Sequence, residues 1–138
     1  MLKVLVADDE RLARETIKML LNEREEVTEI WEACNGDEAI SLANVHHPDV
    51  VILDIEMPQK NGLEVAQLLP PHCIIVFVTA FNEHAIEAFE LSAVDYILKP
   101  FDDERFHKML NKISERVTDK NTLDLTQISD VIKQATHK

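Results

Sequence analysis

The residues of this chain that could do chemistry come directly after short apolar runs. They are an acidic pair, a single acid, a hydroxyl and an amine: Asp8 and Asp9, Asp54, Thr79, and Lys99. Two like charges about 4 Å apart repel by roughly 4 kcal/mol at an effective dielectric constant near 20. No Lys or Arg stands beside the acidic pair before Arg11. Carboxylates gathered at one place therefore need another source of positive charge.

A divalent cation would make three carboxylates in one pocket tolerable, and hard oxygen ligands select Mg²⁺ or Mn²⁺. Lys99 would pair with the remaining negative charge, and Thr79 offers a hydroxyl donor. A metal, a cation and a donor around one carboxylate are what phosphoryl transfer requires. Asp54 is the natural nucleophile, because aspartyl phosphate is an established covalent intermediate. These residues predict a site that accepts a phosphoryl group.

These side chains can meet only if regular elements bring them to one place. Short β-branched runs alternate with amphipathic helical patterns along the chain. We expect strands at 3–7, 27–33, 50–53, 74–78 and 95–98, and helices at 12–22, 36–46, 63–69, 83–91 and 103–117. Strict alternation predicts an α/β fold, a doubly wound parallel sheet of five strands flanked by five helices. Ligands bind outside the carboxyl ends of the strands in such sheets.

Composition excludes several function classes. The chain has 138 residues, 46 % of them hydrophobic, which suits one domain with a proper core. The net charge of −12 repels phosphate backbones, so the chain alone is expected to bind nucleic acid poorly. The sequence shows no signal peptide and no stretch that could span a membrane, so we expect a cytoplasmic protein. Cys34 and Cys73 are expected to be buried free thiols.

The motifs around these residues resemble the receiver domain of two-component response regulators. The acidic pair, DIEMP around Asp54, VTA ending at Thr79-Ala80, and DYILKPF around Lys99 occur in that family's order over about residues 2–117. The resemblance implies a flavodoxin-like fold with strand order 2-1-3-4-5. It also implies that a sensor histidine kinase phosphorylates Asp54. Such a domain is regulatory, and it catalyses only its own phosphorylation and slow dephosphorylation.

The resemblance further implies roles for residues around the phospho-acceptor. Asp8, Asp9, Asp54 and the backbone carbonyl of Glu56 would surround Mg²⁺, and Lys99 would contact the phosphoryl group. The peptide bond between Lys99 and Pro100 would be cis.

A second set of implied roles concerns the response to phosphorylation. Thr79 and Tyr96 would form a coupled switch pair, and Ile86, Phe89 and Tyr96 would belong to an output face. Family members commonly dimerise through this face, so the resemblance implies a homodimer on phosphorylation.

The segment FVTAFNEHAIEAFELSAVDYILKPF is similar to receivers attached to LytTR-type DNA-binding domains. That similarity implies transcription regulation, with DNA contacted only through an effector domain that this chain does not include. We expect a receiver over 1–117, then a linker and an amphipathic helix over 118–138. That helix would pack on the receiver, pair in a dimer, or lead into an effector. A fragment and a stand-alone receiver both remain open.

Two alternative functions remain at this point. A small Mg²⁺-dependent phosphohydrolase resembling haloacid dehalogenases would also use an aspartate nucleophile. Such enzymes carry a second Asp two residues after the nucleophile, where this chain has Glu56, and their nucleophile usually follows the first strand rather than the third. The other alternative is a docking receiver that works without phosphorylation. It is weakened because no expected member of the site is missing.

Overall fold

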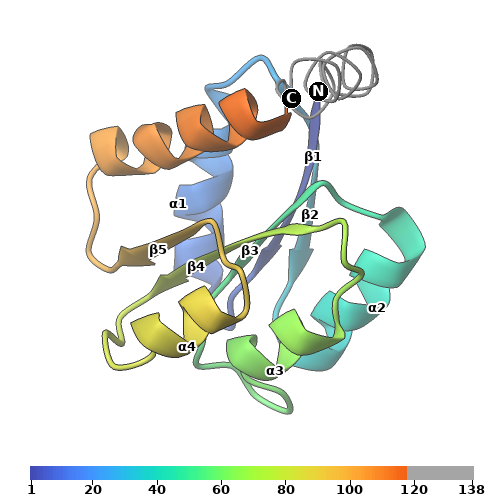
Figure 1. The fold of residues 1–138 in the computed structure, drawn as a ribbon. Helices are drawn as coiled ribbons and strands as arrows, with labels where there is room; N and C mark the ends of the chain where they lie inside the picture. Colours follow the sequence, from blue (N-terminus) through green and yellow to red (C-terminus); the bar gives the residue numbers. More distant parts are fainter. Residues whose placement is uncertain (118–138) are drawn as a thin grey trace, which may run out of the picture.

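The computed structural model describes residues 1–117, and the linker and helix expected for 118–138 lie outside the described residues. Strands and helices alternate along the described chain (Figure 1). The strands are β1 (Leu2–Ala7), β2 (Val27–Ala33), β3 (Val50–Leu53), β4 (Ile74–Thr79) and β5 (Asp95–Leu98). The helices are α1 (Arg11–Asn22), α2 (Gly36–His46), α3 (Gly62–Leu68), α4 (Ala85–Glu90) and a final helix over 103–117, called here the 103–117 helix.

All five strands of the described chain form one parallel sheet in the order β2-β1-β3-β4-β5. The chain first steps outward from β1 to β2 and then returns past β1 to build β3, β4 and β5 on the other side. The direction of winding therefore reverses between β1 and β3, which is where doubly wound sheets bind ligands. The expected fold class and strand order are both confirmed.

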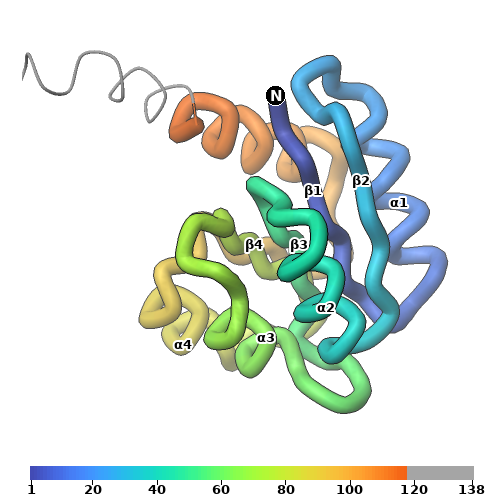
Figure 2. Tube along the Cα trace, turned by 90° about the vertical axis from the view of Figure 1, so that its right-hand side faces the viewer, coloured from blue at the N-terminus to red at the C-terminus, as the bar shows by residue number. Residues whose placement is uncertain are grey.

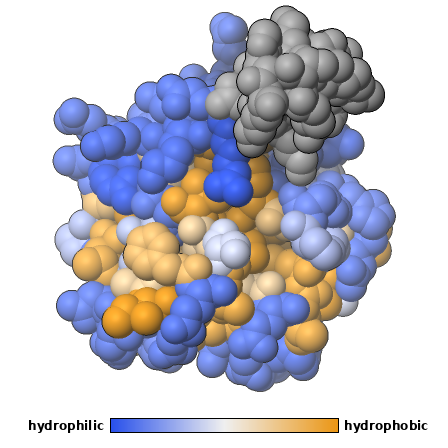
Figure 3. All heavy atoms as spheres, viewed as in Figure 1, coloured by the Kyte–Doolittle hydropathy of each residue, from blue (hydrophilic) through white to orange (hydrophobic). Residues whose placement is uncertain are grey.

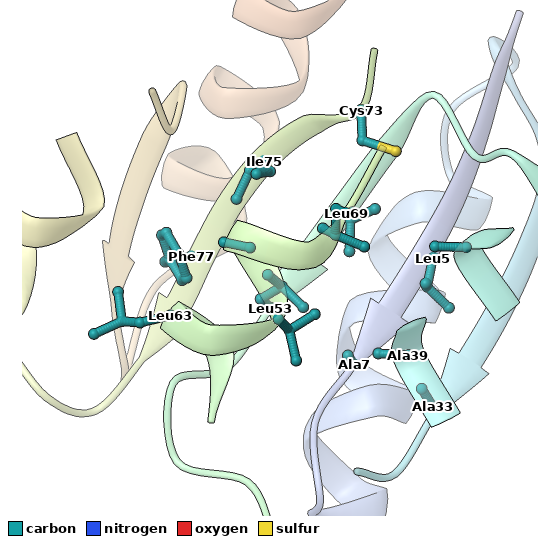
Figure 4. Packing of buried hydrophobic residues seen from close by; sticks show 14 of the residues in the cluster. Leu5, Ala7, Ala33, Ala39, Leu53, Leu63, Leu69, Cys73, Ile75 and Phe77 are labelled. Atoms are coloured by element: carbon teal, nitrogen blue, oxygen red, sulfur yellow. The ribbon is translucent and has the colours of Figure 1, made fainter. Parts of the chain in front are cut away.

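Helices cover both faces of the sheet, so the central strands are buried on both sides (Figures 1 and 2). Successive strand residues point to opposite faces. Leu5 and Ala7 pack with α2, α3 and α4, whereas Val4 and Val6 pack with α1 and the 103–117 helix. Figure 4 shows part of the first of these two clusters. This two-sided burial explains why β1, β3 and β4 read as continuous apolar runs.

The element ends follow local chemistry. Asn61 begins α3 with a capping box: its side chain accepts from the Glu64 N–H at 2.9 Å, and the Glu64 carboxylate accepts from the Asn61 N–H at 3.1 Å. Helix α4 is shorter than the expected 83–91. His84 before it has a non-helical backbone without a side-chain cap, and Ser92 after it has a φ of 63°.

The two thiols differ in environment, which corrects one expectation. Cys73 is buried, as expected, but Cys34 is exposed. Cys34 follows the end of β2, which is an edge strand of the sheet, so no further strand covers it. None of the helices in the described part of the chain is long and apolar enough to cross a membrane.

Candidate functional site

Strand register brings the first two acidic residues of the site together. Ala7 of β1 pairs with Leu53 of β3, so Asp8 and Asp54 leave the sheet side by side. The backbone N–H of Asp54 donates to the Ala7 carbonyl at 2.9 Å. Asp8 is 1 % exposed and Asp54 is 6 % exposed. Two nearly buried carboxylates therefore stand at the point where the winding of the sheet reverses.

Lys99 joins these two carboxylates from the far side of the sheet. Its backbone N–H donates to the Thr79 carbonyl at 2.8 Å, continuing the pairing of β4 with β5. Its Nζ donates to Asp8 Oδ2 at 2.7 Å and to Asp54 Oδ2 at 3.1 Å. The peptide bond between Lys99 and Pro100 is cis. One ammonium group is thus shared by two carboxylates.

The charges in this cluster do not balance. Burial raises the pKa of the Asp8 carboxyl above its ordinary value, and the charge of Asp54 adds to the effect against the opposing hydrogen bond from Lys99. Burial alone would lower the pKa of Lys99, but the hydrogen bond to Asp8 and the charge of Asp54 outweigh it and raise that pKa. Lys99 therefore stays charged, and the cluster retains an excess of negative charge.

A second group of carboxylates overlaps this cluster at Asp8 and extends to the surface. Asp8, Asp9 and Glu10 each bring one carboxylate oxygen within 4.8 Å of the others. Asp9 and Glu10 are exposed, whereas Asp8 links this trio to Lys99 and Asp54. Oxygen donors beside an excess of negative charge suit Mg²⁺. Glu10 was not among the ligands predicted from the sequence, although it directly follows the acidic pair.

Glu56 contacts the central acid through its backbone. Its N–H donates to Asp54 Oδ1 at 3.3 Å, and its side chain is exposed. Both oxygens of Asp54 therefore have a donor, Oδ1 from the backbone and Oδ2 from Lys99. This contact orients the carboxylate and was not anticipated, since the sequence prediction concerned only the Glu56 carbonyl.

Thr79 and Tyr96 are connected through the backbone of Phe81. The Thr79 side chain is fully buried, and its Oγ accepts from the Phe81 N–H at 3.4 Å. The half-buried Tyr96 donates its hydroxyl to the Phe81 carbonyl. Burial raises the pKa of the Tyr96 phenol, and the charge of Glu83 adds to this. Phe81 is thus part of the site, and no sequence signal had singled it out.

The surface beside Tyr96 is apolar. Ile86 and Phe89 on α4 are 75 % and 66 % exposed. Figure 3 shows hydrophobic atoms gathered over α4. Both residues were predicted to belong to an output face, and their side chains lie in solvent.

Asp95 is a buried acid whose role the sequence did not reveal. It is 8 % exposed and accepts two hydrogen bonds from Arg105, of 3.0 and 2.7 Å. These contacts tie β5 to the 103–117 helix just before Tyr96. The sequence had marked Asp95 only as the first residue of a strand.

The sequence profile of the response regulator receiver domain matches residues 4–111 of the chain. The chain belongs to the receiver domain family. Receiver domains belong to regulatory proteins of two-component systems, in which they interact with histidine kinases and output domains and bind Mg²⁺ at the acidic phosphorylation site. This membership places the chain in a signalling family rather than among the haloacid dehalogenases.

Curated relatives support the more specific resemblance. The receiver domain is 47 % identical over 125 residues to an uncharacterized response regulatory protein of Yersinia pestis, covering 89 % of this chain and 52 % of that protein. It is 46 % identical over 121 residues to the sensory transduction protein LytT of Bacillus anthracis, covering 84 % and 48 %. It is 44 % identical over 117 residues to the transcriptional regulatory protein BtsR of Escherichia coli, covering 83 % and 49 %. The similarity to LytTR-type receivers is confirmed, and the chain spans about half the length of these relatives.

Solved structures agree with the fold. The response regulatory domain of mrkE from Klebsiella pneumoniae superposes with a TM-score of 0.79 at 36 % identity, covering 83 % of this chain and 96 % of that one. The REC domain of AraT from Geobacillus stearothermophilus gives a TM-score of 0.77 at 33 % identity, covering 87 % and 98 %. Both are receiver domains matched over nearly their whole length.

Proposed function

We propose that this receiver domain accepts a phosphoryl group on Asp54 from a phosphohistidine of a sensor kinase. The observation that carries the proposal is the pair of buried carboxylates, Asp8 and Asp54, that share the single ammonium group of Lys99. Burying two carboxylates with one ammonium group destabilises a fold, but the same arrangement favours binding of a metal ion and a phosphoryl group.

In the transfer step, an Asp54 oxygen forms a bond to phosphorus while the phosphorus–nitrogen bond of phosphohistidine breaks. The electron pair of that bond returns to the imidazole, which takes up a proton. Lys99 lies within hydrogen-bond distance of Asp54 Oδ2 and offsets the charge of the phosphorylated side chain. Asp8, Asp9, Asp54 and the Glu56 carbonyl would hold Mg²⁺, which when bound supplies positive charge opposite the phosphoryl oxygens.

The switch that follows would use Thr79 and Tyr96. The Thr79 hydroxyl makes only a 3.4 Å contact with the Phe81 N–H, so it can turn toward a phosphoryl group at small cost. Tyr96 would then move into the space that Thr79 leaves and give up its bond to the Phe81 carbonyl. The result is a changed surface around α4 and β5, a bistable packing element biased by a local charge.

The output that we propose is transcription regulation through a LytTR-type DNA-binding domain. BtsR carries the name transcriptional regulatory protein, and LytT that of a sensory transduction protein. Residues 1–117 would form the receiver, and 118–138 would lead toward the effector. Phosphorylation would promote a homodimer through the exposed face that includes Ile86 and Phe89, and DNA would be bound only by the effector.

The test is the intact mass of the protein after incubation with acetyl phosphate or phosphoramidate, with and without Mg²⁺. We expect one phosphoryl adduct that requires Mg²⁺, is absent from Asp54→Ala, and persists in the matched control Asp103→Ala, which removes an exposed acid. No adduct in the wild type would support the docking receiver instead. Sustained release of phosphate would indicate a hydrolase.

A further inference from the structure

The loop between β3 and α3 closes on itself at a glycine. This loop, residues 55–61, carries Glu56 and follows Asp54 directly. The Gly62 N–H donates to the Ile55 carbonyl at 2.8 Å. A Cβ at Gly62 would lie 2.3 Å from the Asp54 carbonyl oxygen and 2.9 Å from the Ile55 Cα. Only a glycine at position 62 allows the two ends of the loop to meet this closely.

The other glycine of the chain supports the same loop from outside. Gly36 is the first residue of α2, and a Cβ there would lie 2.2 Å from the Lys60 carbonyl oxygen and 2.6 Å from the Lys60 Cβ. The chain contains two glycines in all. Both are therefore placed where the backbone of this one loop, or of the acid before it, approaches too closely for a side chain.

Further contacts hold the loop against α2. The Pro58 carbonyl accepts from the Gly36 N–H at 3.4 Å and from the Lys60 N–H at 2.9 Å. The Lys60 ammonium pairs with Asp37 of α2 at 2.9 Å. Gln59, at the tip of the loop, has a φ of 72°, which lies in the left-handed region. A residue other than glycine keeps this conformation only where the surrounding structure fixes it. The loop is thus held at its base by Gly62 and at its tip by α2.

We infer that Gly36 and Gly62 are positioning residues for the divalent cation, because the clamped loop fixes the direction of the Glu56 backbone carbonyl beside Asp54. The inference rests on the proposed function, in which that carbonyl is a metal ligand. A backbone carbonyl has no side-chain rotamers, so its direction depends on the contacts that fix the conformation of the loop. Gly36 acts from α2, an element that contributes no proposed ligand, through its close approach to Lys60.

Mg²⁺ binding measured by titration calorimetry tests this inference. Replacement of the supporting contacts around metal ligands typically costs about 10- to 100-fold in affinity. We expect Gly36→Ala to raise the Mg²⁺ dissociation constant at least about tenfold, although alanine is the better helix former. Ser41→Ala, on an exposed position of the same helix, is the matched control and should bind Mg²⁺ like the wild type.

The urea midpoint of each variant distinguishes an effect on the position of the metal ligand from an effect on the stability of the fold. A lowered midpoint with unchanged Mg²⁺ affinity of the folded protein would overturn the inference and leave the proposed function intact. If Gly36→Ala does not fold, Pro58→Gly tests the inference in its place. This substitution makes the exposed turn at position 58 more flexible and adds no side-chain volume. Unchanged Mg²⁺ affinity in that variant would overturn the inference. A wild-type protein that binds no Mg²⁺ would instead overturn the metal site of the proposed function.

Discussion

At the scale of single residues, Asp8 and Asp54 are buried side by side with one ammonium group between them. We predict that Asp8→Asn raises the free energy of unfolding by about 1 kcal/mol, a typical gain when a destabilised functional site is relieved. Asparagine keeps an oxygen for the Glu10 N–H and removes one of the two like charges. Urea denaturation measures the change.

The same variant should form less of the Mg²⁺-dependent phosphoryl adduct, because it removes a carboxylate from the proposed metal site. Asp9→Asn is the matched control for stability, since Asp9 is exposed and its charge is already solvated. A lower unfolding free energy for Asp8→Asn would show that its ion pair with Lys99 outweighs the cost of burial.

At the scale of elements, β5 is held to the 103–117 helix by the Asp95–Arg105 pair. We predict that Arg105→Met lowers the free energy of unfolding by about 1–2 kcal/mol. The substitution leaves a nearly buried carboxylate without its two charged hydrogen bonds, and the partial exposure of the Arg105 side chain limits the loss. Chemical denaturation compares it with Lys108→Met, an exposed position on the same helix that should change stability little.

A second contact of this helix predicts a dependence on pH. Hydrogen bonds from Arg24 and then from Ser114 lower the pKa of the Glu26 carboxyl from 4.5 to about 2. The folded state therefore holds this proton more weakly than the unfolded chain, so the stability that Glu26 contributes is complete above pH 4.5 and is lost as the pH falls toward 2. We predict that Glu26→Gln reduces the loss of stability in this range.

Urea midpoints at neutral pH and at a pH of about 3 check the Glu26 prediction. Glu29→Gln on the exposed side of β2 serves as the control and should follow the wild type. An equal acid loss in wild type and Glu26→Gln would contradict the pairing with Arg24.

The same elements show what a sequence can and cannot predict. All five strands were predicted to within one residue at each end. For β1, β3 and β4 the reason is burial on both faces, which leaves a largely apolar run in the sequence. The carboxyl ends of those runs then located the candidate residues. The contacts of Phe81 and Asp95 could not be predicted, since a backbone carbonyl and a helix-borne arginine meet their partners only after the chain has folded. The burial of Cys34 was predicted wrongly for a related reason: apolar neighbours do not reveal that a strand lies at the edge.

At the scale of the whole molecule, charge and apolar surface oppose each other. The chain carries a net charge of −12, which disfavours association of two copies. Helix α4 nevertheless exposes Ile86 and Phe89 beside Tyr96, the residue proposed to act as a switch. Dimerisation through this face therefore requires that the free energy gained by burying apolar side chains exceed the repulsion between the two negatively charged copies. Added salt screens that repulsion and should strengthen the dimer.

These opposing effects yield a test of the proposed dimer. We predict that a stable phosphoryl mimic converts the protein at tens of micromolar from monomer to dimer in sedimentation, because the altered face around Tyr96 then allows Phe89 to be buried between copies. Phe89→Asp should weaken that dimer by about tenfold or more, since it removes a central apolar contact and adds charge. Val45→Asp adds the same charge at an equally exposed position on α2 and should leave the dimer in place. A monomer in the presence of the mimic would show that this face binds a different partner, and equal weakening by both variants would mean that net charge alone controls the association.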